Sequence, residues 1–567
     1  MVQRSGERPH DNRSESPDST GGGSGSPEPK QDFDEIDHQS AGERADEVKP
    51  QTRRRQWIGL VAGVVLAALV YAILPAEVGQ GARLTAATAV LMGLWWMTEA
   101  IPIPATALLP LVIFPVFGSD EAGESISVND VGAAYGNNVI FLFMGGFIIA
   151  LAMQRWNLHR RIALVTVAAM GTKPPMVIAG FMIATGFLSM WVSNTATAVM
   201  MIPIGVSVLA LVLDLGKESS ADTDGTAEPT SKATGTGTSS DEPVDGETLT
   251  QAVIKSNFGT ALMLGIAYAA SIGSLGTIIG TPPNTLLVGY LEGEGMDIGF
   301  LEWMIAGVPL AVVFLVITWF LLTHVLFKPE IDDIPGGRRI IRDQLDALGS
   351  MSQGEIRVAA IFGLTALAWI AVPLIWDENP PISDTGIAMT AAILLFLLPS
   401  GSKPGVKLLD WETAIKLPWG VLLLFGGGLA LSQQFESSGL TAWIGDVAAG
   451  LDTIPVIVLV VIAATAIIFL TEITSNTATA ATFLPVAGGV AMGMGLDPLV
   501  LTIPVALAAT CAFMLPVATP PNAVAYASGY VTIGQMIRGG LWLNLIGIVL
   551  ITLAAYTVFA WSLGIAY

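Results

Sequence analysis

Six residues, Ser-Asn-Thr-Ala-Thr-Ala, occur twice in this chain of 567 residues, at Ser193–Ala198 and at Ser475–Ala480. Phe143 recurs as Phe425 at the same spacing, and both pairs of positions differ by 282. A spacing that stays constant from Phe143 to Ala198 indicates a duplicated unit. Each copy also interrupts a long apolar segment. Polar breaks in both halves of a duplicated apolar chain are typical of the binding sites of secondary transporters.

The composition predicts a membrane protein. Charged residues make up 13% of the chain and hydrophobic residues 52%, whereas soluble domains carry about 25% charged residues. Apolar runs such as Trp57–Leu74, Phe300–Phe327 and Leu541–Leu563 are long enough to cross about 30 Å of hydrocarbon. We therefore predict an all-α polytopic membrane protein with about eleven transmembrane helices.

The net charge is −21, and much of the acid lies in two polar stretches, Met1–Arg55 and Asp214–Glu247. Both bury too little apolar surface to offset the entropy of ordering, so we predict that both are disordered. Such acidity either repels nucleic acid or solvates a protein in a salt-rich cytoplasm; we favour the second interpretation, which indicates a halophilic prokaryote. Nucleic acid is not an expected partner.

The predicted domain organisation places the repeat between polar segments. An acidic tail covers 1–55, the first repeat half covers 56–327 with an insert at 214–250, a cytoplasmic linker covers 328–357, and the second half covers 358–567. Three arginines at 53–55 precede the first apolar run. By the positive-inside rule we expect a multi-pass protein of the plasma membrane with a cytoplasmic N-terminus.

Each Ser-Asn-Thr copy is predicted to form the tip of a re-entrant hairpin. Residues 176–192 separate Pro175 from the first copy, which is about 25 Å of helix and too short to span the hydrocarbon. A second broken segment, here called the break, follows each hairpin and ends in Thr-Pro-Pro-Asn; it includes Ser271–Asn284 in the first half and Ala518–Asn522 in the second. An odd number of spans in each half favours an inverted repeat.

The side chains of the tips suit two kinds of ligand. Asn, Ser and Thr offer carbonyl and hydroxyl oxygens that suit Na⁺, as do the free carbonyls of unwound backbone. Free N–H groups at the start of a returning helix suit an anion. No Arg or Lys lies in either motif, so bound cations and helix ends must supply the positive field. The alternative is that small polar residues only allow close helix packing, and two identical copies argue against it.

Other polar or small residues receive structural interpretations. We expect the glycine runs at Gly145 and Gly427 to be close-packing sites. Glu472 is interpreted as an anchor for the second tip in preference to a proton carrier. The one cysteine, Cys511, and four scattered histidines give no metal cluster, and no nucleophile–base pair is present, so an enzyme is not expected.

The twin Ser-Asn-Thr motifs, each followed by Thr-Pro-Pro-Asn, resemble the divalent-anion:sodium symporter family from Trp57 to the C-terminus. The resemblance implies a homodimer of eleven-span protomers in which a transport domain moves like an elevator against a fixed scaffold. One departure is Ser274, where the family has a second glycine. The resemblance also implies the site residues: a first sodium site at Ser189, Ser193, Asn194 and Gly273; a second at Thr471, Thr474, Asn476, Ala518 and Pro520; and substrate contacts from Asn194, Thr195, Asn476, Thr477 and Pro520.

The expected function is sodium-coupled symport of a small dianion, most directly a C4-dicarboxylate such as succinate, malate or fumarate. Three alternatives stay open: an anion exchanger with the same fold, a carrier of citrate or sulfate, and a passive anion channel. A channel needs no paired cation sites, so the twin motifs argue against it.

Overall fold

The computed structural model describes residues 49–221, 256–331, 337–376, 380–451 and 453–565. Contacts divide the chain into two units, Met1–Arg53 and Arg54–Tyr567, and the architecture below is that of the second. The described residues are almost entirely helical, with β-bridges only at Ser119–Ser125 and Pro399–Lys407. The predicted all-α class is confirmed.

The helices of the first half precede residue 331. They are α2 (Pro50–Ile73), α3 (Gln80–Thr98), α4 (Ile103–Thr106), α5 (Pro110–Phe117), α6 (Val128–Ala133), α7 (Asn138–Arg155), α8 (Leu158–Met170), α9 (Pro174–Ser189), α10 (Asn194–Ala221), α12 (Asn257–Gly273), α13 (Pro282–Gly293) and α14 (Phe300–Phe320).

The remaining helices belong to the linker and the second half. They are α15 (Gly337–Ala347), α16 (Gln353–Ile375), α17 (Asp384–Leu397), α18 (Trp411–Ala414), α19 (Trp419–Ser437), α20 (Leu440–Ala448), α21 (Val456–Thr471), α22 (Asn476–Gly493), α23 (Leu499–Thr510), α24 (Pro520–Ala527), α25 (Ile533–Ala554) and α26 (Ala560–Leu563).

Six helical segments of the described residues are long and apolar enough to cross a membrane, and shorter apolar helices accompany them. Helix α12 is buried along almost its whole length, whereas only 11% of the most apolar part of α2 is buried. The long central helix therefore contacts protein on every side, and α2 exposes apolar side chains such as Trp57 and Val65. This distribution fits a protein whose outer surface faces lipid.

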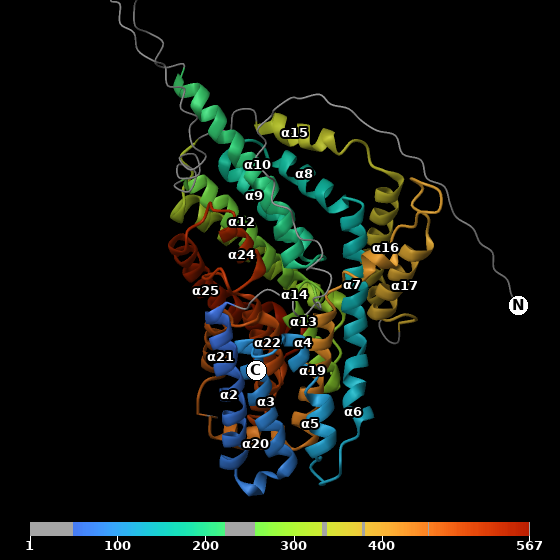
Figure 1. Cartoon of the computed structure of the whole chain (residues 1–567), viewed down its shortest axis with the longest axis vertical. Helices are drawn as coiled ribbons and strands as arrows, with labels where there is room; N and C mark the ends of the chain where they lie inside the picture. Colours follow the sequence, from blue (N-terminus) through green and yellow to red (C-terminus); the bar gives the residue numbers. More distant parts are fainter. Residues whose placement is uncertain (1–48, 222–255, 332–336, 377–379, 452, 566–567) are drawn as a thin grey trace, which may run out of the picture. The chain divides into compact units, whose positions relative to one another are not determined.

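The duplication seen in the sequence is also a duplication of helix boundaries. Helices α9 and α21 both begin and end at positions that differ by 282, and α8 with α20 and α10 with α22 begin at that spacing. The loop between the hairpin arms is Met190–Ser193 in the first copy and Glu472–Ser475 in the second. Figure 1 shows α9 and α10 in the upper part of the view and α21 and α22 in the lower part.

Contacts between the two halves are reciprocal. Within each half the first hairpin arm packs on the helix before the Thr-Pro-Pro-Asn break, α9 on α12 and α21 on α23. Between halves, the returning arm of one hairpin packs on the helix after the other break, α10 on α24 and α22 on α13. Such crosswise packing is the arrangement that an inverted repeat requires. The hairpin tips and the breaks are therefore parts of one packed centre.

Two boundaries differ from those predicted. Helix α10 continues to Ala221, into the insert that the sequence placed at 214–250, because Asp214–Ala221 contains only one glycine and no proline to end the helix. The rest of that insert and the tail at 1–48 lie outside the described residues. The linker holds helix α15, and α16 begins at Gln353 rather than after 357, where Ser352 and Glu355 form a capping box.

The glycines at 145 and 427 have the close-packing role predicted for them. A Cβ atom at Gly145 would lie 2.7 Å from the Cβ of Ala388, and one at Gly427 would lie 2.3 Å from the carbonyl oxygen of Ala107. Both distances are far below van der Waals contact. These glycines allow neighbouring segments to approach closely.

Candidate functional site

The first tip is fixed by hydrogen bonds around Asn194. Ser189 is the last residue of α9, and its hydroxyl lies 2.8 Å from Asn194 Oδ1 and 2.5 Å from the Ala270 carbonyl oxygen, two acceptors that share its single O–H. Asn194 Nδ2 in turn donates to Ser274 Oγ at 3.2 Å. Ser193 Oγ accepts from the Ala196 N–H at 3.3 Å and caps the start of α10. The tip is thereby tied to the first break.

The second tip repeats the central part of this geometry. The Thr471 hydroxyl lies 2.7 Å from Asn476 Oδ1 and 3.0 Å from the Ala509 carbonyl oxygen. Position 471 corresponds to 189 and position 476 to 194 at the repeat spacing of 282, so a hydroxyl orients the asparagine in both copies. The Thr474 hydroxyl forms its hydrogen bonds within the tip: it lies 2.9 Å from the Leu470 carbonyl oxygen and 2.7 Å from Thr479 Oγ1.

Each Thr-Pro-Pro-Asn sequence ends an unwound segment and starts a helix. Proline at the first helical position suits α13 and α24, because its missing N–H has no helical partner there. The asparagine that follows donates Nδ2 back to carbonyls of its own break: Asn284 to Thr277 at 2.9 Å, and Asn522 to Ala512 and Leu515 at 3.1 Å each. The unwound backbone keeps a fixed shape for this reason.

The same two asparagines present oxygen atoms that are not used within the protein. Asn284 Oδ1 and Asn522 Oδ1 are buried and have no hydrogen-bond partner among the described residues. An unpaired buried acceptor is costly, at about 1–3 kcal/mol, unless a ligand satisfies it. The sequence motif placed these asparagines at the breaks, but only the burial shows that their carbonyl oxygens are free to bind.

The predicted site residues differ in accessibility. Ser189, Gly273, Thr471, Thr474, Thr477 and Ala518 are buried; Ser193, Asn194 and Asn476 are half-buried; Thr195 and Pro520 are exposed. Gly273 lies against the backbone of Gly186, where a Cβ would meet the Gly186 carbonyl oxygen at 2.3 Å. Thr195 and Pro520 lie at the beginnings of α10 and α24, two helices that pack together.

The halves meet at one direct polar contact in this region. Thr281 Oγ1, at the end of the first break, lies 3.4 Å from Thr510 Oγ1, the last residue of α23. Both side chains are buried. The contact places the two breaks next to each other, although neither threonine was among the predicted site residues.

Glu472 anchors the second tip, as the sequence interpretation proposed. Its carboxylate accepts hydrogen bonds from three successive backbone N–H groups, those of Phe513, Met514 and Leu515, at 2.7, 2.9 and 3.1 Å. Asn544 of α25 donates a fourth at 2.7 Å. None of the ion pairs of the described residues includes Glu472. Backbone dipoles and one amide therefore compensate a carboxylate that is almost fully buried.

Oxygen atoms without formal charge dominate both tips. No Arg or Lys occurs in Met190–Ala198, Ser271–Asn284, Ile473–Ala480 or Cys511–Asn522. The described residues contain no group of three or more His, Cys, Asp or Glu side chains that could hold a metal ion. Hydroxyl and carbonyl oxygens suit a weakly charged hard cation, and four helix N-termini, those of α10, α13, α22 and α24, suit an anion.

A family model described as "Sodium:sulfate symporter transmembrane region" matches residues 54–565. The chain belongs to the sodium:sulfate symporter family. This membership confirms the predicted resemblance and makes the chain an integral membrane transporter rather than an enzyme.

Among its relatives are sodium-dependent dicarboxylate transporters named SdcS. Those of Staphylococcus saprophyticus and Staphylococcus aureus (strain USA300) are each 41% identical to this member of the sodium:sulfate symporter family over 516 residues, which is 90% of this chain and 92% of the relative. A solved structure, the YdaH transporter of Alcanivorax borkumensis, aligns with a TM-score of 0.50 at 14% identity and covers 91% of this chain and all of the other. That similarity concerns the fold alone.

Proposed function

We propose that this protein is a sodium-coupled symporter of a small dianion, and that its substrates are C4-dicarboxylates such as succinate, malate and fumarate. The observation that carries the proposal is the pair of tips in which a hydroxyl orients an asparagine, Ser189 on Asn194 and Thr471 on Asn476. The names of the relatives, sodium-dependent dicarboxylate transporters, support both the ion and the substrate class.

Each tip is proposed to hold one sodium ion. The first site comprises oxygen atoms of Ser189, Ser193, Asn194 and Gly273, and the second those of Thr471, Thr474, Asn476, Ala518 and Pro520. Thr474 is proposed to contribute through its backbone carbonyl, because its hydroxyl is already engaged by Leu470 and Thr479.

The dianion is proposed to bind between the tips, with one carboxylate at Asn194 and Thr195 and the other at Asn476, Thr477 and Pro520. With no basic side chain in either motif, the sodium ions and helix N-termini supply the positive field. Substrate affinity must then depend on sodium, and sodium affinity on substrate. This mutual dependence distinguishes a symporter from a passive channel.

The transport cycle is proposed to be elevator-type in a homodimer, with the hairpins and breaks in the moving domain and the N-terminus in the cytoplasm at the plasma membrane. The packing of both hairpins on both breaks supports their movement as one body. The halophilic origin stays a prediction.

The test is uptake of radiolabelled succinate into proteoliposomes with an inward sodium gradient, with equal sodium, and with choline in place of sodium. We expect accumulation only with the gradient. Competition by malate, fumarate, citrate and sulfate, each at the same concentration, distinguishes the substrate classes. Uptake that is equal in sodium and choline would show a channel or a carrier driven by another ion. Succinate efflux that requires external anion would show an exchanger.

A further inference from the structure

A cavity separate from the hairpin tips lies between α13 and α19. Its lining comprises Asn137, Gly289, Tyr290, Gly293, Glu294, Leu429, Ser432, Gln433 and Glu436. It encloses about 280 Å³ of space between protein atoms, including its open side. We call it the α13–α19 cavity.

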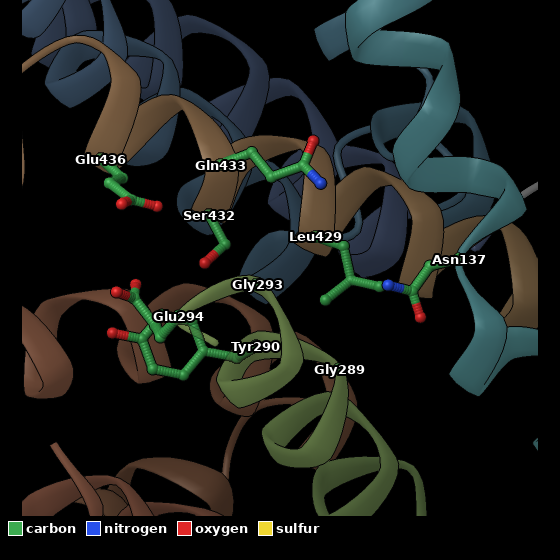
Figure 2. A pocket seen from close by; sticks show the side chains of 9 residues that line it. All are labelled: Asn137, Gly289, Tyr290, Gly293, Glu294, Leu429, Ser432, Gln433 and Glu436. Atoms are coloured by element: carbon green, nitrogen blue, oxygen red, sulfur yellow. The ribbon is translucent and has the colours of Figure 1, made fainter. Parts of the chain in front are cut away.

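Oxygen atoms from both helices point into this cavity. Figure 2 shows the Ser432 hydroxyl and the Glu436 carboxylate extending from α19 toward Glu294 and Tyr290. The Tyr290 hydroxyl lies beside the carboxylate of Glu294, at the C-terminal end of α13. The lining contains two carboxylates and no Lys, Arg or His. An anion, the substrate dianion included, is repelled here, and a cation is attracted.

Ser432 supplies the observation that points to a ligand. Its side chain is only 8% exposed, and its hydroxyl has no hydrogen-bond partner among the described residues. A helical serine usually donates to the carbonyl four residues earlier, and this one instead points into the cavity beside two carboxylates. A buried hydroxyl in this position has an oxygen lone pair to offer to a cation.

The position of Tyr290 is fixed by the second hairpin. A Cβ atom at Gly488 of α22 would lie 1.8 Å from the Tyr290 hydroxyl oxygen, so the ring occupies the space that a larger residue would fill. The Glu294 and Glu436 carboxylates line the same cavity and repel each other in the absence of a counterion.

We propose that the α13–α19 cavity binds a hard metal cation through Glu294, Glu436, Ser432 and the Tyr290 hydroxyl. Carboxylate and hydroxyl oxygens are the ligands that calcium prefers, and a sodium ion accepts the same donors. The site is distinct from the two tips. Because α13 begins at the first break and packs on α22, a cation here links α19 to a helix that joins the first break to the second hairpin.

The experiment measures thermal unfolding of the purified full-length protein in detergent without substrate, in choline buffer to which calcium alone or sodium alone is added. We expect one of the cations to raise Tm through this cavity. Glu294→Gln and Glu436→Gln should each raise the concentration for half of that effect by roughly tenfold or more, the order for losing a charged ligand. Ser432→Ala should raise the cation concentration for half of the Tm effect by a smaller factor. Glu77→Gln, which removes an exposed carboxylate outside the cavity, should match the wild type.

The two cations separate the possible ligands. A calcium response that the variants weaken shows a calcium site, and a sodium response that they weaken shows a third sodium site beside the two tips. Glu436 is exposed, so its replacement by Gln leaves the fold testable even where Glu294→Gln does not. The proposal is overturned if the wild type responds to neither cation, or if the variants respond to both as the wild type does. The assay contains no dianion, so its outcome is independent of the proposed symport.

Discussion

The two hairpin tips have the same six residues but are held in different ways. In the first copy the position equivalent to Glu472 is Met190, whose carbonyl oxygen accepts from Thr277 Oγ1 at 2.5 Å. In the second copy the Glu472 carboxylate accepts from three N–H groups of the break and from Asn544. Neutral hydrogen bonds, from Thr277 to Met190 and from Asn194 to Ser274, thus join tip to break in one half, and a buried charge joins them in the other.

The two breaks also differ in exposure. Residues 271–281 of the first break are all buried, whereas Val517 in the second is 80% exposed and Pro520 is also exposed. The two copies thus share the hydrogen bond between a hydroxyl and the tip asparagine, while the contacts that support the tips differ. The second break is the more exposed one, and it is held by the hydrogen bonds to the Glu472 carboxylate. This is expected if those hydrogen bonds stabilise the second break in place of the side-chain packing that stabilises the buried first break.

The largest effect is expected from making the second tip like the first. Glu472→Met leaves one buried N–H group, two partly buried N–H groups and the buried Asn544 amide without their acceptor. Each such group costs about 1–3 kcal/mol, so we expect a loss of at least about 3 kcal/mol and a fall in Tm of several degrees. Thermal unfolding in detergent measures it. Met190→Leu is the matched control and should change Tm little; an unchanged Tm for Glu472→Met would contradict the anchor.

Glu472→Gln sharpens the same comparison. An anchor requires acceptor oxygens, and Gln retains one, so this variant should be destabilised less than Glu472→Met and should keep sodium-driven uptake. A proton carrier requires ionisation, and the variant would then be stable but inactive. Uptake and Tm measured on one preparation distinguish these outcomes.

The asparagines of the tips should give the next largest effect, and an equal one in both halves. Asn194→Ala and Asn476→Ala each remove a group that bonds a carboxylate in the proposed site. Each should weaken succinate binding by about 1–3 kcal/mol, roughly 5- to 150-fold. Calorimetric titration at saturating sodium measures this. Ser207→Ala and Thr465→Ala, on exposed faces of the same hairpins, are the controls, and normal binding by either asparagine variant would indicate a packing role only.

The hydroxyls behind the asparagines should have smaller effects on sodium. Ser189→Ala and Thr471→Ala remove one hydrogen bond each and should raise the sodium concentration for half-maximal succinate binding roughly two- to tenfold. Saturating sodium should partly restore affinity. Thr474→Ala should raise the sodium concentration for half-maximal succinate binding less, because the Thr474 hydroxyl forms hydrogen bonds within its own tip. A larger effect at Thr474 than at Thr471 would assign its hydroxyl to the ion.

The smallest effect concerns the ends of α7 and α19, which also differ between the halves. Arg155 ends α7 and pairs with Asp410, whereas the equivalent position at the end of α19 is Ser437. Hydrogen bonds from Arg155 and from Thr413 hold the pKa of Asp410 well below its usual range. The pair is partly exposed to solvent, so we expect it to contribute no more than about 1 kcal/mol.

The sign of its pH dependence follows from the lowered pKa. The contribution is present above the unfolded-state pKa of about 3.9 and is lost as pH falls through the lower folded-state value. The difference in Tm between wild type and Asp410→Asn should therefore be constant between neutral and mildly acidic pH and should shrink only in strong acid. A difference that disappears near pH 6 would point to another group.

The repeat, the helical membrane class and the position of both tips could be predicted from the order of residues along the chain. Ser-Asn-Thr and Thr-Pro-Pro-Asn are local signals, since small polar residues favour the N-cap of a helix and proline favours its first position. The spacing of 282 therefore predicted where α10 and α22 begin. The Ser-Asn-Thr motif also predicted that Asn194 and Asn476 lie at the tips, and their role as ligands is part of the proposal above.

Only the tertiary structure decided which groups meet. Ser274, Asn544 and the Thr281–Thr510 pair lie far in sequence from the groups they contact, and no local pattern marks them. The unpaired oxygens of Asn284 and Asn522, and the Ser432 hydroxyl that faces two carboxylates, are likewise visible only when burial is known. The physical reason is that a hydrogen bond or a cavity depends on distances across the chain, whereas helix periodicity and capping depend on neighbours along it.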